Sequence, residues 1–277
     1  MNRRVTRDPT ALRWLLIGLT VVFLIGVVVL PIAVILVEAF SDGLAVYFAA
    51  LVEENAWQAI KLTLQAAAIV VPLNTLFGFA AAWAISRFAF RGKNVLVTLI
   101  DLPFAVSPVI AGMIFVLLFG AHGLLGPLLT KYDVKIIFAL PGIVVATLFV
   151  TVPFVARELL AFMQAQGNDD EEAALTLGAS GWQMIRHVTL PNIKWSLLYG
   201  VILCNARAMG EFGAVSVVSG HIRGQTNTIP LHVEILYNEY QFSAAFAVAS
   251  LLVALALLTL LVKRIVEWRT GPPGRRH

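Results

Sequence analysis

The sequence has few charged residues and a single cysteine. Only 13% of its 277 residues are Asp, Glu, Lys or Arg, whereas 59% are hydrophobic. That charged share is about half of what soluble domains usually carry, so one water-soluble domain could not cover this much apolar surface. The same composition excludes disordered, collagen-like and disulfide-rich classes. A membrane protein remains, with room for several spans but for no large soluble domain.

Motifs for catalysis and for metal binding are missing as well. Cys204 has no second cysteine with which to form a disulfide, and no metal-site spacing is present. The sequence contains no GxxxxGK[S/T] phosphate loop, no HExxH motif and no nucleophile elbow. We therefore expect a chain that is not an enzyme and binds no cofactor itself. The net charge of +4 comes from residues beside apolar stretches, which favours a membrane protein over one that binds nucleic acid.

Six apolar stretches predict transmembrane helices. They cover residues 14–37, 62–85, 95–119, 136–155, 196–218 and 242–262. Each has about 20 residues, enough to cross a hydrocarbon core of ~30 Å as a helix. The ~10-residue alternating segments of a strand barrel are not seen, so we predict an all-α protein in one transmembrane domain, 1–277. The first stretch exceeds the ~7–15 residues of a signal-peptide core, and we expect it to be retained.

The basic residues divide unevenly between the two sides of these spans. One side has Arg3, Arg4, Arg7, Arg13, Arg87, Arg91, Lys93, Arg157, Arg186, Lys194, Lys263, Arg264, Arg269, Arg275 and Arg276. The other side has Lys61, Lys131, Lys135 and Arg223. Cytoplasmic loops carry an excess of Lys and Arg, so we expect both termini in the cytoplasm.

The third apolar stretch contains the segment DLPFAVSPVIAG, residues 101–112. Its two prolines lie five positions apart, with Ser107 directly before Pro108. This pattern fits either an ordinary membrane-helix kink or a kinked helix that lines a path which opens and closes. Asp101 is interpreted as a helix-end or water-facing residue.

The long cytoplasmic connection, about 157–193, predicts two short helices. Asn168 is a good N-cap with Glu171 at the capping-box position, and Gly178 can end this first helix. Ser180 and Gln183 repeat the capping pattern for the second helix, which we expect Pro191 to stop. Two further sets of residues give the helices apolar strips: Ala173, Ala174 and Leu177, then Trp182, Met184 and Ile185. Helices this short are marginal alone, so these strips need a partner surface, either this chain's own helix ends or another chain.

This connection resembles the EAA loop of ABC importer permeases. Glu172-Ala173-Ala174, three residues, Gly178, nine residues, then Val188-Thr189-Leu190-Pro191 follows the family pattern EAA-x3-G-x9-I-x-L-P. Val188 in place of isoleucine is the one departure. The resemblance implies the type I importer permease (MetI-like) fold with six transmembrane helices. It also implies a loop that docks on an ATP-binding subunit through Glu172, Ala173, Ala174, Gly178, Trp182, Leu190 and Pro191.

Residues 205–240 are similar to the sulfate/molybdate permease group, and most of all to CysW-type subunits of sulfate/thiosulfate importers. The words SVVSGHIRG and LHVEILYNEY carry this likeness. It implies a bacterial inner-membrane protein in contact with lipid and three kinds of partner. These are an ATP-binding subunit dimer that holds ATP and Mg, a second permease subunit of the CysT type, and a periplasmic sulfate/thiosulfate-binding protein. A molybdate or tungstate permease, a secondary anion transporter and a non-transporting scaffold remain as alternatives.

Two charges fall inside the fifth stretch. Arg207 and Glu211 are four residues apart, so they share one face of a helix. They form either an ion pair that fixes helix packing or, with Ser107 and Pro108, part of a positively biased anion path.

The predicted periplasmic loop, about 219–241, carries basic residues that face the exterior. We expect His221 and Arg223 in this loop to meet a docked binding protein. His122, His221 and His232 are interpreted as loop residues without metal spacing.

Overall fold

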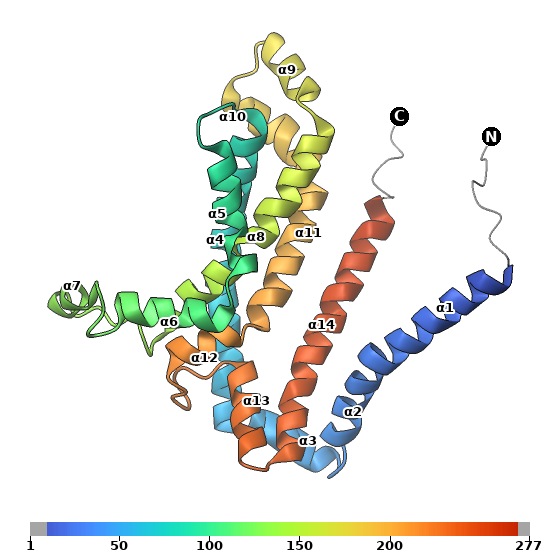
Figure 1. The fold of residues 1–277 in the computed structure, drawn as a ribbon, viewed down its shortest axis with the longest axis vertical. Helices are drawn as coiled ribbons and strands as arrows, with labels where there is room; N and C mark the ends of the chain where they lie inside the picture. Colours follow the sequence, from blue (N-terminus) through green and yellow to red (C-terminus); the bar gives the residue numbers. More distant parts are fainter. Residues whose placement is uncertain (1–9, 271–277) are drawn as a thin grey trace.

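A computed structural model describes residues 10–270, with side chains described as far as Ile265. These residues form helices and no strand, which confirms the all-α prediction. Five basic residues used for the orientation lie outside the described residues: Arg3, Arg4, Arg7, Arg275 and Arg276. The first helix runs from Thr10 toward the end opposite helix α9 (Asp169–Thr176), and the last helix runs back from that end to Thr270 (Figure 1).

Four helical stretches are long and apolar enough to cross a membrane. The first runs from Thr10 to Ala39 through α1 (Thr10–Leu24), a π-helical turn η1 (Ile25–Val29) and α2 (Leu30–Ala39). The others are α4 (Glu54–Arg87), α8 (Leu140–Gln166) and α14 (Phe242–Thr270). A short helix, α3 (Leu44–Val52), joins α2 to α4. These helices confirm the first, second, fourth and sixth predicted spans. α4 begins earlier than the predicted 62, and α8 begins later than the predicted 136 and extends beyond the predicted 155.

The third and fifth predicted spans are each a bent pair of helices, and the kink expected in the third span is a sharp break. α5 (Lys93–Ala105) and α6 (Pro108–Phe119) meet at 108°, and the stretch Gly181–Met209 meets α12 (Gly213–Ser219) at 49°. Each bent pair counts as one span if the total is six. Pro108 explains the sharper break, because a proline excludes the preceding residue from the helical region. Ser107 has an extended ψ of 132°.

Helices α4, α8 and α11 (Leu190–Met209) form the central packed block. Gly78 of α4 lies so close to α8 that an added Cβ would be 2.8 Å from Cβ of Val155. Gly200 of α11 approaches the same residue, since its added Cβ would be 3.2 Å from Cα of Val155. Side chains larger than glycine would push these helices apart, so the block depends on small residues as membrane helix interfaces commonly do.

The two broken spans pack on each other beside this block. An added Cβ at Gly112 of α6 would lie 2.7 Å from the carbonyl oxygen of Ala214, and one at Gly213 would lie 2.9 Å from Cβ of Pro108. The break before α6 and the break before α12 are therefore neighbours. α6 and the following α7 (Gly126–Lys131) project sideways from the block (Figure 1).

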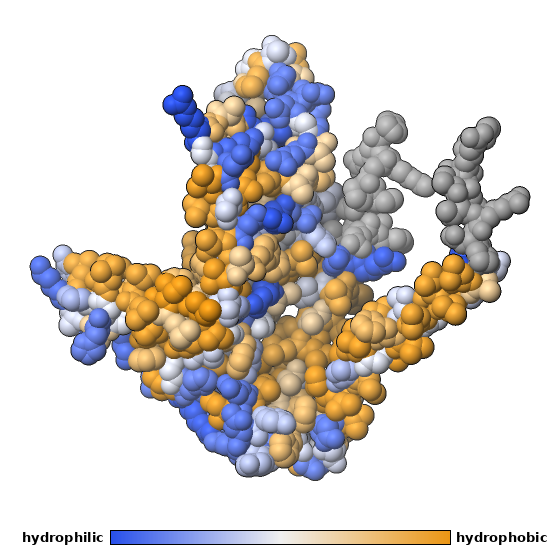
Figure 2. All heavy atoms as spheres, viewed as in Figure 1, coloured by the Kyte–Doolittle hydropathy of each residue, from blue (hydrophilic) through white to orange (hydrophobic). Residues whose placement is uncertain are grey.

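Apolar side chains cover the outside of the first span and of α6. Figure 2 shows this hydrophobic surface along both projecting arms. In the most apolar part of Thr10–Ala39, no residue is buried within the chain. Such a surface suits lipid or another membrane protein.

The predicted periplasmic loop contains a helix, α13 (Ile229–Asn238), which packs on α4 and α14. The prediction of His232 as a loop residue is wrong, because His232 is only 2% exposed within α13. Pro230 at the start of this helix supplies the fixed φ that favours a first helical turn. Leu231 and Leu236 are buried alongside His232 and hold the helix against the core.

Candidate coupling segment and intramembrane polar site

The connection between the fourth and fifth spans has two short helices, as predicted, but it is shorter than 157–193. Residues 157–166 complete α8, and the chain then forms α9, α10 (Gly181–Met184) and a π-helical turn η2 (Ile185–Thr189). Gly178 ends α9 with a φ of +88°, a conformation that glycine adopts without strain. The capping box at Ser180 is confirmed: its N–H donates to Oε1 of Gln183 at 2.8 Å, and the Gln183 N–H donates to its Oγ at 3.4 Å.

The predicted capping roles of Asn168 and Glu171 are wrong. α9 does begin at Asp169, yet no side chain caps it. The backbone carbonyl of Asn168 accepts the N–H groups of Glu171 and Glu172 instead. Both predicted capping side chains turn to Arg87, the last residue of α4, because a buried guanidinium has a greater need of acceptors than a solvated helix end.

Pro191 does not stop the second helix, so that prediction is wrong. The helix continues from Gly181 through η2 into α11, with Leu190 in the helical region at φ −61° and ψ −45°. A proline removes one backbone hydrogen bond and its ring presses on the carbonyl four residues earlier. That carbonyl belongs to His187, inside the π-helical turn, where the wider backbone accommodates the ring. The second half of the coupling segment, from Gly181, and α11 are thus one continuous helix, whereas α9 is a separate helix.

The outer end of this segment exposes apolar side chains. Leu177 is 88% exposed and Trp182 is 69% exposed. Glu172 and Ala173 are also exposed, whereas Ala174 is half-buried. An exposed tryptophan is a residue type that often anchors a protein interface. We call Leu177 and Trp182 the apolar tip.

The inner side of the segment packs on its own spans. Met184 is 7% exposed, and Leu190 packs against the core of the α4–α8–α11 block. Pro191 is exposed at the start of α11. Of the second apolar strip, Met184 therefore packs on this chain's own spans, whereas Trp182 and Leu177 of the apolar tip are uncovered.

Arg207 and Glu211 form the predicted ion pair, with Nη1 of Arg207 2.6 Å from Oε2 of Glu211. They do not share a helix face, because Glu211 lies in the non-helical break after α11. Its other oxygen accepts the N–H of Ala214 at 2.9 Å in the first turn of α12. The Glu211 side chain is 1% exposed and that of Arg207 is 33% exposed. The carboxylate is thus fully enclosed, while the guanidinium reaches the surface.

Ser107 and Pro108 lie at the neighbouring break, with Ser107 exposed and Pro108 half-buried. The contact of Pro108 with Gly213 brings this break beside the one that contains Glu211. The sequence placed these residues in two different spans and gave no sign that they meet.

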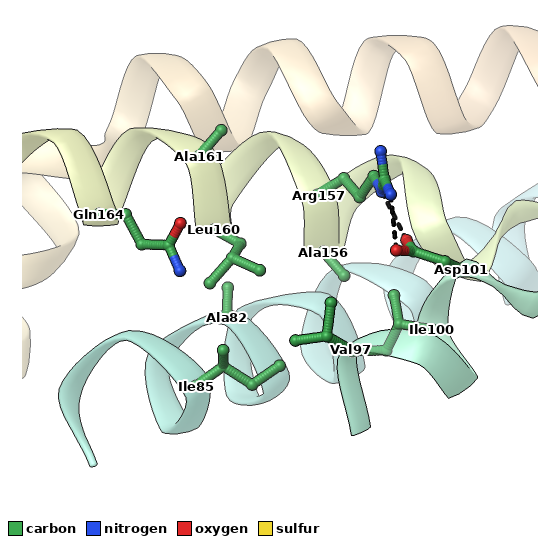
Figure 3. Close-up of a pocket in the computed structure, with 10 residues that line it drawn as sticks. All are labelled: Ala82, Ile85, Val97, Ile100, Asp101, Ala156, Arg157, Leu160, Ala161 and Gln164. Atoms are coloured by element: carbon green, nitrogen blue, oxygen red, sulfur yellow. Dashed lines mark hydrogen bonds and ion pairs between the residues drawn. The ribbon is translucent and has the colours of Figure 1, made fainter. Parts of the chain in front are cut away.

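Asp101 is held by an ion pair that the sequence analysis did not predict. Its carboxylate accepts two hydrogen bonds from Arg157 of α8, each at 2.5 Å. Figure 3 shows this pair at one end of a cavity of about 220 Å³ between α4, α5 and α8. Ile85, Val97 and Leu160 make much of the remaining wall apolar. Arg157 therefore belongs to the helix pair and not to a cytoplasmic loop.

On the opposite side of the molecule, the residues expected to meet a binding protein are exposed. Arg223 pairs with Glu239, and Nδ1 of His221 lies 3.9 Å from Oε2 of Glu234.

Burial lowers the pKa of His232 from its ordinary value of 6.5, against an opposing effect of Glu53.

The residue most clearly missed by sequence reasoning is Arg87. Counting it as one of many cytoplasmic basic residues gave no reason to single it out. One signal was present: it lies at the end of a long apolar stretch, where an arginine with a long aliphatic stem can be drawn into the core.

Comparisons with known proteins identify the family. Residues 74–271 match the family described as "Binding-protein-dependent transport system inner membrane component". A "Sulfate transport system permease protein CysW" of Synechococcus elongatus is 52% identical over 99% of this chain and 96% of that protein. The CysW protein of Escherichia coli K12 is 49% identical over 95% of this chain and 91% of its own. The CysT permease of the same organism is 34% identical over 92% of both chains.

Solved structures agree on the fold. A bacterial alginate ABC transporter, in complex with its alginate-bound periplasmic protein, matches with a TM-score of 0.77. It is 18% identical and covers 93% of this chain and 94% of that chain, so it shows the fold alone. Together, the coupling segment, the broken spans and the near full-length identities mean that this chain belongs to the binding-protein-dependent inner membrane components, as an ABC permease of the CysW type.

Proposed function

We propose that this chain is a transmembrane permease subunit of an ATP-driven importer for sulfate and thiosulfate. The observation that carries the proposal is the identity of about half of the residues, over nearly the whole chain, to permeases named for sulfate transport. The apolar tip is exposed, and a continuous helix joins its Trp182 to the fifth span. Both features support an ATP-hydrolysing subunit on a separate chain. No observation favours molybdate or tungstate over sulfate.

The partners follow from this role. An ATP-binding subunit dimer would hold ATP and Mg and receive the apolar tip in a groove, with Glu172 pairing to a basic residue there. A CysT-type permease would be the second membrane subunit, since a CysT protein is similar to this chain over nearly its whole length. A periplasmic binding protein would dock near His221 and Arg223. The first helix begins and the last helix ends on the side of the molecule toward α9, which supports cytoplasmic termini in an inner-membrane protein.

Alternating access would be driven through the coupling segment. When ATP closes the partner subunits, the segment would move, and α11 would move with it because α10, η2 and α11 form one continuous stretch of helix. The breaks at Ser107 and at Glu211 are the places where α6 and α12 can change direction relative to the block. Arg207 would give the nearby path a positive bias. Such a path passes a doubly charged oxyanion without trapping it, so tight selectivity would belong to the binding protein.

Reconstitution in proteoliposomes tests the function directly. The complex would contain this chain, a CysT-type permease, the ATP-binding subunits and the binding protein. We expect sulfate-loaded binding protein to stimulate ATP hydrolysis and sulfate uptake, and molybdate-loaded binding protein to stimulate neither. Stimulation by molybdate alone would assign the molybdate alternative, and uptake without the ATP-binding subunits would assign a secondary transporter.

The anion path has its own test in the double variant Arg207→Met/Glu211→Leu. Removing both charges avoids leaving one of them buried and unpaired. We expect slower sulfate uptake from an assembled complex, and uptake at the wild-type rate would refute a role of Arg207 in the path.

A further inference from the structure

The coupling segment is tied to the spans at one buried arginine. Nε of Arg87 lies 2.7 Å from Oε2 of Glu171, and its Nη2 donates to Oε1 of the same carboxylate at 3.2 Å. Nη1 donates to Oδ1 of Asn168 at 2.5 Å and to the carbonyl of Met163 at 3.3 Å. The Arg87 and Glu171 side chains are 8% and 9% exposed. Arg87 thus joins the end of α4 to the last turn of α8, to Asn168 directly before α9, and to Glu171 within α9.

The same carboxylate also reaches the helix on the far side of the coupling turn. Oγ1 of Thr189, in η2, donates to Oε1 of Glu171 at 2.8 Å. Thr189 is 1% exposed. Five polar contacts therefore connect α4, α8, α9 and η2 around one guanidinium and one carboxylate. Because these groups are directional as well as buried, they fix the orientation of α9 and not merely its distance from the spans.

The packing of α4, α8 and α11 determines how a force on α9 passes into the spans. α4, α8 and α11 are held together by the close approaches of Gly78 and Gly200 to Val155. A force on α9 therefore reaches three tightly packed helices at once, and not α11 alone.

On these grounds, and resting on the proposed function, we propose that Arg87 is the positioning residue that couples the ATP-driven motion of the coupling segment to the spans. Its planar fork is suited to this role, because one guanidinium can bond several acceptors in fixed directions, which a lysine cannot do. Arg87 touches neither substrate nor nucleotide in this scheme. It converts docking of the apolar tip into a common motion of the α4–α8–α11 block.

The decisive variant is Arg87→Met/Glu171→Leu, studied in the reconstituted complex. Replacing a buried ion pair by apolar residues of similar size is commonly neutral or stabilising, whereas the directional bonds are lost. We expect the variant complex to assemble and to unfold at the wild-type temperature. The sulfate taken up per ATP hydrolysed should fall about tenfold, within the usual range for a lost coupling energy. Wild-type uptake per ATP in this assembled variant would overturn the proposal.

A milder variant keeps the proposal testable if the double variant does not fold. Thr189→Val keeps the side-chain shape and removes only the bond from η2 to Glu171, so uptake per ATP should fall about twofold. An unchanged ratio in Thr189→Val, with Arg87→Met/Glu171→Leu unable to assemble, would show that the network is structural and would also overturn the proposal. Arg91→Met is the matched control, since it removes an exposed arginine four residues away and should leave the ratio unchanged.

The wild-type complex, measured in parallel, separates this proposal from the proposed function. If the wild type shows no sulfate-dependent ATP hydrolysis, the importer assignment fails. If an active wild type is matched by an equally coupled variant, only the role of Arg87 fails.

Discussion

The carboxylate of Glu211 serves two helices at once. One oxygen pairs with Arg207 at the end of α11, and the other accepts the N–H of Ala214 at the start of α12. The spacing of four residues predicted the pair correctly. It could not predict that Glu211 lies in a helix break, because the break depends on the packing of Gly213 against Pro108 from another span.

Glu211→Ala should therefore destabilise the protein strongly. The substitution leaves the N–H of Ala214 buried without an acceptor and removes the partner of Arg207. We expect a loss of roughly 2–4 kcal/mol, below the full value for a buried pair because Arg207 is partly exposed. Thermal unfolding in detergent measures it, with Glu211→Gln as the control that retains an acceptor. An unchanged unfolding temperature in Glu211→Ala would show that neither contact matters for stability.

His232 predicts a pH dependence of stability. Burial lowers the pKa of His232 in the folded protein below 6.5, so the unfolded chain binds a proton more readily than the folded one. The stability contributed by neutral His232 is complete above about pH 6.5 and is lost as the pH falls below that value.

Unfolding temperatures at pH 7.5 and 5.5 check this. We expect the wild type to lose stability over this interval and His232→Leu to lose less of it. Equal losses in the two proteins would mean that His232 does not cause the dependence.

At the scale of helices, the interface between α4 and α8 depends on the absence of a side chain at Gly78. An alanine there would place its Cβ 2.8 Å from Cβ of Val155 and 2.9 Å from the backbone nitrogen of Ala156. We expect Gly78→Ala to cost about 1–3 kcal/mol, more than the ~1 kcal/mol that alanine gains in helix propensity.

Gly18→Ala is the matched control for this prediction. Gly18 also lies in a membrane-spanning helix, but nothing lies within 4 Å of its added Cβ. It should be neutral or slightly stabilising in the same thermal unfolding measurement, and equal effects of the two substitutions would contradict the close packing of α4 and α8.

The sequence predicted helices well where local pattern decides, and less well where contacts between helices decide. Apolar length sufficed for the first, second, fourth and sixth spans, and the turn residues Gly178 and Ser180 were read correctly. Pro108 was read as a kink, but its angle of 108° follows from the packing of α6 on α12. Pro191 was read as a stop because a π-helical turn that accommodates a proline leaves no local signature.

The candidate site was predictable in the same uneven way. The fixed spacing from Glu172 to Pro191 predicted a coupling segment without knowledge of the fold, since the motif lies in one continuous stretch. Its docking on an ATP-binding subunit stays a prediction. The contacts of Arg87 with Glu171 and of Asp101 with Arg157 join residues 84 and 56 positions apart. No pattern within a single span indicates such pairs.

At the scale of the whole molecule, the apolar tip and the two helix breaks lie apart from each other. The apolar tip belongs to the turn between α9 and α10 at one end, the α4–α8–α11 block extends away from these helices, and α6 and α12 lie farther along the molecule (Figure 1). Every part of the proposed mechanism requires that a separate ATP-binding subunit engages this tip.

Leu177→Asp/Trp182→Asp tests that central claim most directly. Both side chains are exposed, so charges there should leave the fold intact while abolishing an apolar contact. At ~2 kcal/mol for each anchor residue, association should weaken by about 30-fold per residue. Leu124→Asp, at an equally exposed leucine between α6 and α7, is the control.

The measurement is co-purification of the ATP-binding subunits together with ATP-driven sulfate uptake in proteoliposomes. The account predicts that the tip variant loses both, while its thermal stability and that of the control stay at the wild-type value. A tip variant that retains the ATP-binding subunits and transports at the wild-type rate would contradict it.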